Sequence, residues 1–297
     1  LSKLNNTYIS ALPEYINSRS GRIHTSLNQT IVATGRLSST KPNFQNIPIK
    51  TDVGKSIRKA FKPLQSDNLI VSFDYSQIEL RILAHYSNEK KLIDAFNNNI
   101  DIHTRTASLI YGISNDDVDY SHRRVAKIIN YSIAYGAGPF RISEELKIPI
   151  KEASMIINNY FDRYPGIKKY IEETISFGTK NGYVSTILGR QRNTLNLRSS
   201  NRNIQEAEKR ATINMPIQGT ASELIKIAMI DIDNKIKTNK YKTKMILQVH
   251  DELLFEVPQC EKDQIIALVK ENMENAMKFK VPIKVDCNYG INWYEAH

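Results

Sequence analysis

The chain has 297 residues, of which 41% are hydrophobic and 24% charged, as expected for a soluble globular protein with one large domain or two smaller ones. No apolar run approaches the roughly 20 residues of a membrane span, which excludes a transmembrane helix. The net charge of +10 favours a polyanionic partner, because Lys and Arg neutralise phosphates and release counterions. The two cysteines, Cys260 and Cys287, could pair, but so low a content suits a reducing compartment. The first residues lack Met and a signal-like apolar region, so we expect a piece of a longer protein.

The predicted elements change character along the chain. Short apolar pieces and turn residues near the start predict strands and loops, and residues 69–73 are typical of a buried strand that ends at Asp74. The elements that follow are a short helix at 76–86, helical segments over 89–181 with breaks at 112, 136–139 and 165–166, an Arg- and Asn-rich loop at 189–203, a long helix at 206–237, a strand hairpin within 244–257, a helix at 261–278 and a strand at 283–287. This order predicts an α+β fold with a helical insertion.

Two aspartates follow predicted strands. Asp74 comes directly after one apolar run and Asp251 after another, at 245–250. Two such acids side by side repel each other unless a cation lies between them. Mg²⁺ is usually held by one or two carboxylates together with substrate phosphates, and two such ions can stabilise the attacking and leaving oxygens of a displacement. The alternative is that each Asp only caps a helix or turn, and the presence of two in such settings favours the metal site.

One predicted helix shows two chemically different faces. Four side chains spaced by four residues share one slowly drifting stripe, because each such step advances only about 40° around the helix: Arg123, Lys127, Tyr131 and Tyr135. The opposite side is apolar: Val125, Ala126, Ile129 and Ile133. Cations bind phosphates and aromatic rings stack on sugars and bases, so the stripe predicts a nucleoside triphosphate site. A solvated amphipathic helix is the alternative.

A second stripe of the same spacing lies on the long helix predicted at 206–237. It consists of Arg210, Asn214 and Gln218, which can donate to the minor-groove acceptors that all base pairs share. Such contacts depend on the geometry of a base pair and not on which bases form it. A surface polar row is the alternative, and Pro216 predicts a kink. The arginines at 190, 192, 198 and 202 predict either a phosphate-facing loop or a solvated one.

Five blocks of the sequence resemble, in order, the signatures of family A DNA polymerases, the family of bacterial DNA polymerase I. Residues 74–81 resemble its motif A, 123–136 its motif B and 249–252 its motif C; residues 34–48 and 210–219 resemble two further signatures. The resemblance implies a right-hand polymerase with a palm at 1–86 (1–20 near the thumb base) and 207–297, and inserted helical fingers at 87–206. The thumb and exonuclease domains are expected to be largely absent from this chain, as an upstream portion of the same or another chain.

The resemblance also implies a role for each residue of the site. The catalytic residues would be Asp74, Asp251, Lys127 and Glu252, and the ligands of two Mg²⁺ ions (with Mn²⁺ as a substitute) would be Asp74, Tyr75 and Asp251. The nucleotide-binding residues would be Gln77, Glu79, His103, Arg123, Lys127, Tyr131 and Tyr135. The DNA-binding residues would be Arg36, Gln45, Asn46, Arg210, Asn214, Gln218 and His250. Glu79 resembles the residue that excludes a 2′-hydroxyl, and Tyr131 stands where many relatives carry Phe.

The implied reaction is the attack of a primer 3′-hydroxyl on a deoxynucleoside triphosphate, in replication or repair synthesis. The partners would be primer–template DNA and dNTPs, with no membrane, in the cytoplasm at the bacterial nucleoid or alternatively in an organelle. A single-subunit RNA polymerase shares the palm carboxylates, but Glu79 argues against it. A silent nucleic-acid-binding subunit is the other alternative, and the presence of both metal acids and the motif B cations argues against that.

Overall fold

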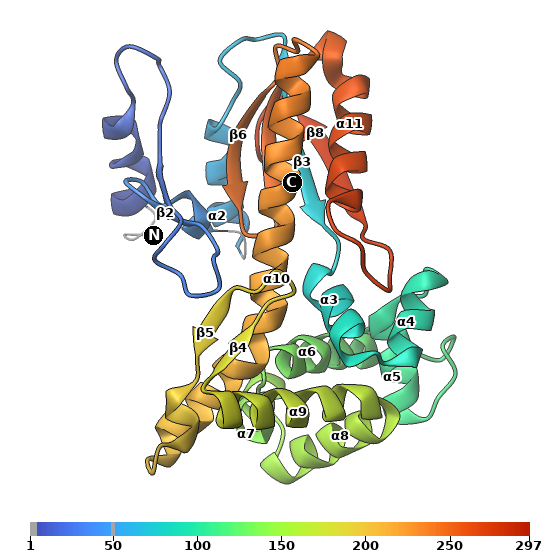
Figure 1. Ribbon diagram of the computed structural model, residues 1–297. Helices are drawn as coiled ribbons and strands as arrows, with labels where there is room; N and C mark the ends of the chain where they lie inside the picture. Colours follow the sequence, from blue (N-terminus) through green and yellow to red (C-terminus); the bar gives the residue numbers. More distant parts are fainter. Residues whose placement is uncertain (1–4, 49–50) are drawn as a thin grey trace. The chain divides into compact units, whose positions relative to one another are not determined.

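Four antiparallel strands form the central sheet of one part of the protein, in the order β6 (Lys244–Val249), β7 (Glu252–Pro258), β3 (Asn68–Tyr75) and β8 (Val285–Gly290). The structure is a computed structural model, which describes residues 5–48 and 51–297. The chain divides into two units: unit 1 contains Leu1–Ser76, Ser222–Met277 and Lys284–His297, and unit 2 contains Gln77–Ala221 and Lys278–Ile283 (Figure 1). The α+β fold class predicted from the sequence is confirmed.

The sheet of unit 1 is held by its apolar central strands. β3 pairs with β7 on one side and β8 on the other, and the rings of Phe73 and Phe255 meet edge to face at 5.5 Å. Helix α11 (Lys262–Asn275) packs on β3, β7 and β8 and buries Ile265 and Val269. Burial of such side chains stabilises the fold by about 1.5–3 kcal/mol each. The ends of β3 and β7 are therefore rigid, and the side chains at these ends are held in fixed positions.

The N-terminal part of unit 1 consists of short elements; the sequence predicts strands and loops there, and most of the elements are helical turns beside short strands. They are η1 (Asn5–Ile9), η2 (Leu12–Tyr15), β1 (Ser26–Asn28), β2 (Ser38–Thr40), η3 (Phe44–Asn46), α2 (Asp52–Ser56) and η4 (Ile57–Ala60), with η6 (Gln259–Glu261) after β7. Phe44, Phe61 and Trp293 form a chain of edge-to-face rings at 5.5 and 5.6 Å. These rings join the N-terminal elements to the last residues of the chain in one apolar cluster.

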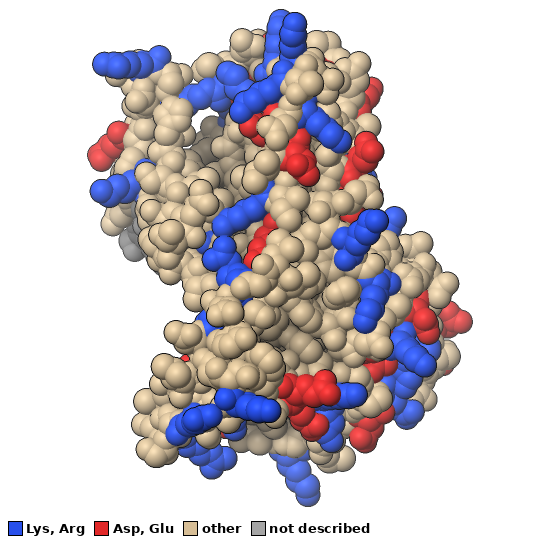
Figure 2. Space-filling view, viewed as in Figure 1, with Lys and Arg blue, Asp and Glu red and all other residues tan. Residues whose placement is uncertain are grey.

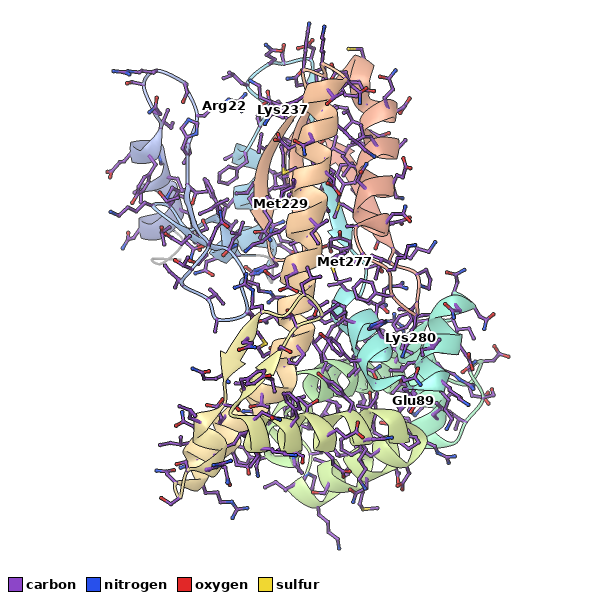
Figure 3. All side chains as sticks on the ribbon, viewed as in Figure 1. Arg22, Glu89, Met229, Lys237, Met277 and Lys280 are labelled. Atoms are coloured by element: carbon purple, nitrogen blue, oxygen red, sulfur yellow. The ribbon has the colours of Figure 1, made fainter. Side chains whose placement is uncertain are left out.

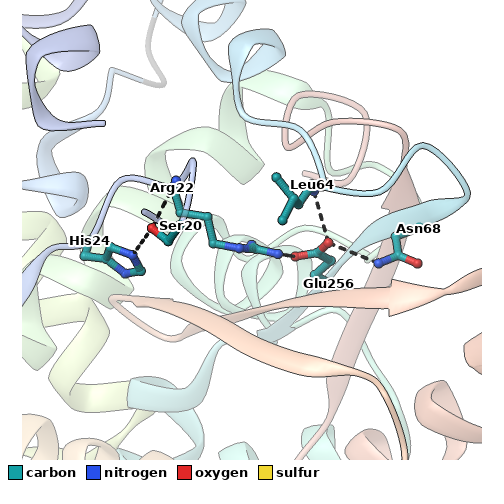
Figure 4. Close-up of polar contacts among 6 residues, drawn as sticks. All are labelled: Ser20, Arg22, His24, Leu64, Asn68 and Glu256. Atoms are coloured by element: carbon teal, nitrogen blue, oxygen red, sulfur yellow. Dashed lines mark hydrogen bonds and ion pairs between the residues drawn. The ribbon is translucent and has the colours of Figure 1, made fainter. Parts of the chain in front are cut away.

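A buried carboxylate ties the N-terminal segment to the sheet (Figure 4). Glu256 of β7 forms an ion pair of 2.5 Å with Arg22, whose place in unit 1 is labelled in Figure 3, and accepts hydrogen bonds of 3.0 Å from the Leu64 amide and from Asn68 Nδ2. Burial by itself would raise the pKa of Glu256, but the hydrogen bonds from Asn68, Arg22 and Leu64 outweigh it and lower that pKa. The Glu256 carboxylate therefore contributes to the folding stability of unit 1.

Replacing Glu256 with Gln is expected to lower the free energy of unfolding by about 1–3 kcal/mol at pH 7, because partners of a buried carboxylate are left poorly satisfied. A lowered carboxylate pKa contributes stability that is present above the unfolded pKa and lost as pH falls through the folded one. The difference between parent and Glu256→Gln should therefore shrink below about pH 4. Denaturant unfolding at pH 7 and below about pH 4 measures this difference in the free energy of unfolding. Glu173→Gln, which replaces an exposed acid, is the control. Equal effects of the two substitutions would contradict the role of Glu256.

Unit 2 is mainly helical. Its elements are α3 (Ile78–Ser87), α4 (Lys90–Asn97), α5 (Ile102–Tyr111), α6 (Tyr120–Ala134), α7 (Pro139–Leu146), α8 (Ile150–Arg163), α9 (Pro165–Asn181), β4 (Tyr183–Ser185), β5 (Gln191–Asn193), η5 (Leu195–Arg198) and the first part of α10 (Arg202–Thr238). The predicted breaks fall at helix ends: Gly112 is left-handed after α5, Gly136 lies just after α6, and Pro139 and Pro165 begin helices. Glu89, labelled in Figure 3, ties α4 to α9 by accepting a hydrogen bond of 2.7 Å from the Gly166 amide.

Two details of unit 2 differ from the sequence-based prediction. The loop expected at 189–203 contains β5 and η5, and two of its arginines bind protein: Arg192 pairs with Glu208, and Arg198 donates to the Thr179 carbonyl at 2.6 Å. Long-range partners of this kind leave no local pattern in the sequence. Helix α10 begins at Arg202, four residues before the predicted start at 206, and continues past Pro216 to Thr238, while the kink at Pro216 stays a prediction. In the described part of the chain, no helix has the length and apolar character that crossing a membrane requires.

Candidate active site

The two aspartates predicted from strand ends lie on neighbouring elements of the sheet of unit 1. The antiparallel register sets Asp74 opposite Glu252, and the Tyr75 amide donates to the Asp251 carbonyl at 3.2 Å. Asp251 lies in the tight turn between β6 and β7, where His250 adopts a left-handed φ of 54°. Arg36 Nη2 lies 3.5 Å from Asp251 Oδ1. The prediction that the sheet brings the two acids together is therefore consistent with this register.

The acids of this edge make each other harder to ionise. The pKa of Asp74 is raised to about 7, first by desolvation within the surrounding protein, although solvent reaches its side chain, and then by the negative charges of Glu252 and Asp251. Burial also raises the pKa of Asp251, against the opposing charges of Arg36 and His250. Such a pair gains from a bound cation, since an opposite charge favours the ionised forms.

The donor atoms at this edge suit a hard cation. Among the residues that the structure describes, no group of three or more His, Cys, Asp and Glu side chains is arranged to hold a metal ion. Two aspartates supply oxygen ligands only, which is the set Mg²⁺ takes when phosphates and water complete its shell. The Tyr75 hydroxyl donates to the Met273 carbonyl at 2.9 Å, so only the backbone carbonyl of Tyr75 is suited to act as a ligand. The residues fit such an ion.

Glu252 belongs to the core rather than to the open edge. It is 4% exposed and accepts hydrogen bonds from Ser72 Oγ at 2.7 Å and from Trp293 Nε1 at 3.2 Å, with His297 Nδ1 3.5 Å away. Burial alone would raise its pKa, but these partners outweigh it and lower the pKa of Glu252. Because these hydrogen bonds occupy the Glu252 carboxylate, its effect on Asp74 comes from its negative charge, which raises the pKa of Asp74. Sequence reasoning did not find Trp293 and His297, although Trp293 is the one tryptophan of the chain.

In unit 2, the predicted stripe and apolar face of α6 are both present. Lys127 is exposed, Arg123 and Tyr131 are half-buried, and Tyr135 is 40% exposed at the end of the helix. The opposite face buries Ala126, Ile129 and Ile133 completely or nearly so, with Val125 half-buried. This face packs α6 against its neighbours α5, α7 and α3. The stripe is therefore turned away from the packed face of α6.

A second helix adds an acid and a histidine to this stripe. Asp101 caps the N-terminus of α5 by accepting from the Thr104 amide at 2.7 Å, and its other oxygen accepts from Arg123 Nη2 at 2.7 Å. Burial would raise the pKa of Asp101, but the Arg123 hydrogen bond and the cap lower it to about 2. The ring centroid of His103 lies 5.8 Å from that of Tyr131. Asp101 was not among the predicted residues, because a helix cap is an ordinary use of Asp.

His103 is neutral at pH 7. Burial lowers its pKa to about 4; the charge of Asp101 opposes this, and Arg123 and Lys127 add to it. The phosphate contact predicted for His103 would therefore be a hydrogen bond from a neutral ring rather than a charge pair. Histidine in this form serves as a donor through one nitrogen and an acceptor through the other.

The remaining nucleotide residues predicted in unit 2 lie at helix ends. Glu79 is buried, with 4% exposure, in the first turn of α3. Gln77 caps α3 with a left-handed φ of 54°, and its carbonyl accepts from the Leu80 and Arg81 amides. Gly136 has a φ of 67°, and a Cβ there would lie 3.0 Å from the Arg210 Cα, so this glycine permits α6 to end against α10.

The predicted DNA-binding residues fall into two groups. On α10, Arg210 is exposed while Asn214 and Gln218 are half-buried, and Asn214 Nδ2 has no hydrogen-bond partner among the described residues. In unit 1, Arg36 and His250 flank Asp251, as described above. Gln45 uses both ends of its amide inside its own segment, donating to the Leu37 carbonyl at 3.1 Å and accepting from the Ser39 amide at 3.3 Å.

Asn46 is exposed, and its carbonyl accepts from the Tyr8 hydroxyl at 2.6 Å. The loop that carries Arg36 is fixed from α10, since Lys226 Nζ donates to the Gly35 carbonyl at 2.6 Å. Surface charge does not locate the site by itself: Figure 2 shows basic side chains spread over the visible face and mixed with acidic ones.

Comparison with known proteins agrees with the motifs. The model of the family described as DNA polymerase family A matches residues 1–295. The chain is 47% identical over 294 residues to the DNA polymerase I of Caldicellulosiruptor bescii, covering 99% of this chain and 34% of that protein. It is 45% identical over 296 residues to the thermostable DNA polymerase I of Thermus thermophilus, covering 100% of this chain and 35% of that one.

A solved structure gives the same result. It is the POL domain of Pol1 from M. smegmatis in complex with DNA primer-template and dNTP, with a TM-score of 0.95, 44% identity, and coverage of 99% of this chain and 52% of that chain. The chain thus spans about a third of the length of these curated relatives and about half of that solved chain. With a family match that extends over residues 1–295, the chain belongs to DNA polymerase family A.

Proposed function

We propose that this chain carries template-directed DNA polymerase activity, adding deoxynucleoside monophosphates to a primer 3′-hydroxyl by two-metal-ion transfer. The observation that carries the proposal is the pair of aspartates at one edge of the sheet of unit 1, where Asp74 lies opposite Glu252 and the Tyr75 amide donates to the Asp251 carbonyl. The raised pKa values of both acids agree with a cation site. The relatives named DNA polymerase I and the solved relative with primer-template and dNTP support it. Catalysis by such a site rests on positioning and charge stabilisation.

Asp74, Asp251 and the carbonyl of Tyr75 would hold Mg²⁺, with Mn²⁺ as a substitute. When bound, the ions supply positive charge to the attacking and leaving oxygens. Arg36 forms an ion pair with Asp251 at 3.5 Å, so it orients this carboxylate before any ligand arrives. Glu252, with its bonds to Ser72 and Trp293, fixes the β7 end of the turn that holds Asp251.

The triphosphate would bind to the residues of α5 and α6. Arg123 offers a planar fork whose Nη2 is oriented by Asp101, Lys127 a mobile point charge, and His103 a neutral N–H. Lys127 would also give a proton to the leaving pyrophosphate, as general acid. Gln77 and Tyr135 complete the predicted nucleotide contacts. Tyr131, beside His103, would lie under the sugar.

The duplex would be held by the donors of α10 and of the segment near Asp251. Arg210 supports this most directly, because it is exposed on α10. Asn214 Nδ2 is buried and lacks a partner among the described residues, so its side chain would have to turn outward to meet a minor-groove acceptor. Arg210 and Gln218 share its face, and Arg36 and His250 would meet the primer terminus. Gln45 would act by shaping the Leu37–Ser39 backbone, while Asn46 would contact the template.

We further propose the division into palm (1–86 and 207–297) and fingers (87–206), with a thumb and an exonuclease-like portion on additional chain. The solved relative, about twice as long, supports such a partner. Bacterial relatives support a place at the bacterial nucleoid in replication or repair synthesis.

Primer extension tests the proposed function. The chain is incubated with a primer–template and with dNTPs or rNTPs, each with Mg²⁺ or with a chelator. We expect extension with dNTPs and Mg²⁺ only. Preferential use of rNTPs would indicate an RNA polymerase, and absence of extension in all four reactions would contradict the proposal.

Substituting Glu79 with Ala is expected to raise ribonucleotide incorporation relative to deoxyribonucleotide by at least about tenfold. A buried carboxylate in the first turn of α3 crowds the 2′ position, and a difference of about 1.4 kcal/mol corresponds to that factor. The ratio of the two kcat/KM values measures it, with Glu144→Ala, at an exposed acid of α7, as control. An unchanged ratio would make Glu79 an ordinary helix residue.

A further inference from the structure

A buried polar cluster lies between α5, α6 and the end of α8. It consists of His103, Thr106, Asn130 and Tyr164, which are 2%, 0%, 1% and 0% exposed. Asn130 Nδ2 donates to His103 Nδ1 at 3.1 Å and to Thr106 Oγ1 at 3.1 Å. Thr106 Oγ1 lies 3.3 Å from Asn130 Oδ1 and 3.0 Å from the Tyr164 hydroxyl. The amide of Asn130 is thus fixed at both ends.

Asn130 interrupts the apolar face of α6. Its neighbours on that face are Ala126, Ile129 and Ile133, all buried. Burying an amide is unfavourable unless its hydrogen bonds are made, so an Asn at this position requires a hydrogen-bond partner on a neighbouring element. Its partner is the ring of His103, the one histidine proposed to touch the nucleotide.

The direction of the Asn130–His103 bond determines the form of the histidine. A ring nitrogen that accepts a hydrogen bond carries no proton, so a neutral ring with Nδ1 as acceptor carries its proton on Nε2. No residue that the structure describes bonds to Nε2, and Nε2 is not among the polar atoms sealed from solvent. Burial and the cations Arg123 and Lys127, opposed by Asp101, keep the ring neutral.

We propose that Asn130 is a positioning residue for nucleotide binding: it holds neutral His103 as the Nε2–H tautomer, so that this N–H is presented to a phosphate oxygen beside Arg123 and Lys127. The proposal rests on the proposed function, which has these three side chains bind the triphosphate. Thr106 contributes to this positioning because its hydroxyl forms a hydrogen bond with the Asn130 amide. Two cations and one neutral donor would bind the phosphates with less mutual repulsion than three cations.

The first experiment observes the tautomer in the full chain without substrate. Two-bond ¹H–¹⁵N spectra at pH 7 distinguish Nε2–H, Nδ1–H and doubly protonated rings, and His103→Gln identifies the signals of His103. We expect Nε2–H in the parent. In Asn130→Asp the carboxylate can only accept, so we expect a proton on Nδ1. A parent with Nδ1–H, or an Asn130→Asp spectrum identical to the parent's, overturns the proposal.

The second experiment measures nucleotide binding by steady-state kinetics. Asn130→Asp and Thr106→Val should each raise KM for dNTP about tenfold or more with a smaller change in kcat, whereas Thr106→Ser, which keeps the hydroxyl, should remain near the parent. In a His103→Gln background, Asn130→Asp should have little further effect, because the two residues act as a unit. Additive losses overturn the proposal. If the parent extends no primer, the proposed function fails, while the spectra still test the tautomer.

Discussion

Asp74→Asn and Asp251→Asn are each expected to reduce primer extension at least about a thousandfold while leaving primer–template affinity nearly unchanged. Loss of one well-placed electrostatic group typically slows catalysis by about 10²–10³, and a lost cation removes more than one such contact. Asn keeps the size and one oxygen of Asp but not the charge. The DNA contacts proposed for Arg210, Asn214 and Gln218 are untouched. Single-turnover extension and a DNA-binding titration measure the two quantities.

The same substitution at Asp74 should stabilise the fold when no divalent cation is present. Its pKa of about 7 lies above the unfolded value, so the folded state binds the proton more tightly and loses stability as pH rises from about 4 to 7. Asp74→Asn removes this loss, and its melting temperature at pH 8 should exceed that of the parent. An acid that is unfavourable for stability but needed for the reaction is a sign of a functional site.

Asp286 offers a matched control. It lies on β8 directly opposite Asp74, is exposed, and contributes to raising the pKa of Asp74. Asp286→Asn removes one charge from the same neighbourhood without removing a proposed ligand, so its extension rate should stay near that of the parent. Extension by the Asp74 or Asp251 variant within tenfold of the parent would refute the metal assignment.

The parts of the site that the sequence predicts are those with a local signal. An apolar run that ends in Asp predicts a strand with an acid at its edge, and a spacing of four predicts the stripe of α6. Gly112 and Pro165 predict helix ends because their backbone preferences act within one turn. In each case the physical cause lies within a few residues of the signal: β3 ends at Tyr75, one residue after Asp74, and helices end or begin at the predicted breaks.

The parts that were missed depend on contacts between distant segments. Asp251 and Glu252 are adjacent in sequence, yet one lies in the turn at the open edge and the other is buried under Trp293. Only the register of β3 against β7 separates their roles. Likewise, Asn130 was counted on neither face of α6, because nothing near it in the chain indicates that His103 lies across the helix interface.

Tyr131→Phe is expected to make the chain reject dideoxynucleotides by a factor of about ten to a hundred relative to the parent. Tyr131 is half-buried with its ring 5.8 Å from that of His103, so it adjoins the proposed phosphate site rather than open solvent. There its hydroxyl can take the space of a missing 3′-hydroxyl and offer a hydrogen bond. With Phe, a dideoxynucleotide leaves polar groups unpaired, which costs about 1–3 kcal/mol.

The ratio of ddNTP to dNTP incorporation, measured as kcat/KM for both substrates, tests this directly, and 1.36 kcal/mol corresponds to a tenfold change in it. The parent should accept both substrates readily. Tyr131→Phe should lower the ratio by lowering kcat/KM for the dideoxynucleotide. Tyr135→Phe removes the same hydroxyl one turn along the stripe, at an exposed ring, and should leave the ratio unchanged. Equal ratios in the parent and Tyr131→Phe would show that the hydroxyl does not stand in for the 3′-hydroxyl. Equal losses in both variants would point instead to a general disturbance of α6, because of these two tyrosines it is Tyr131 whose ring lies 5.8 Å from that of His103.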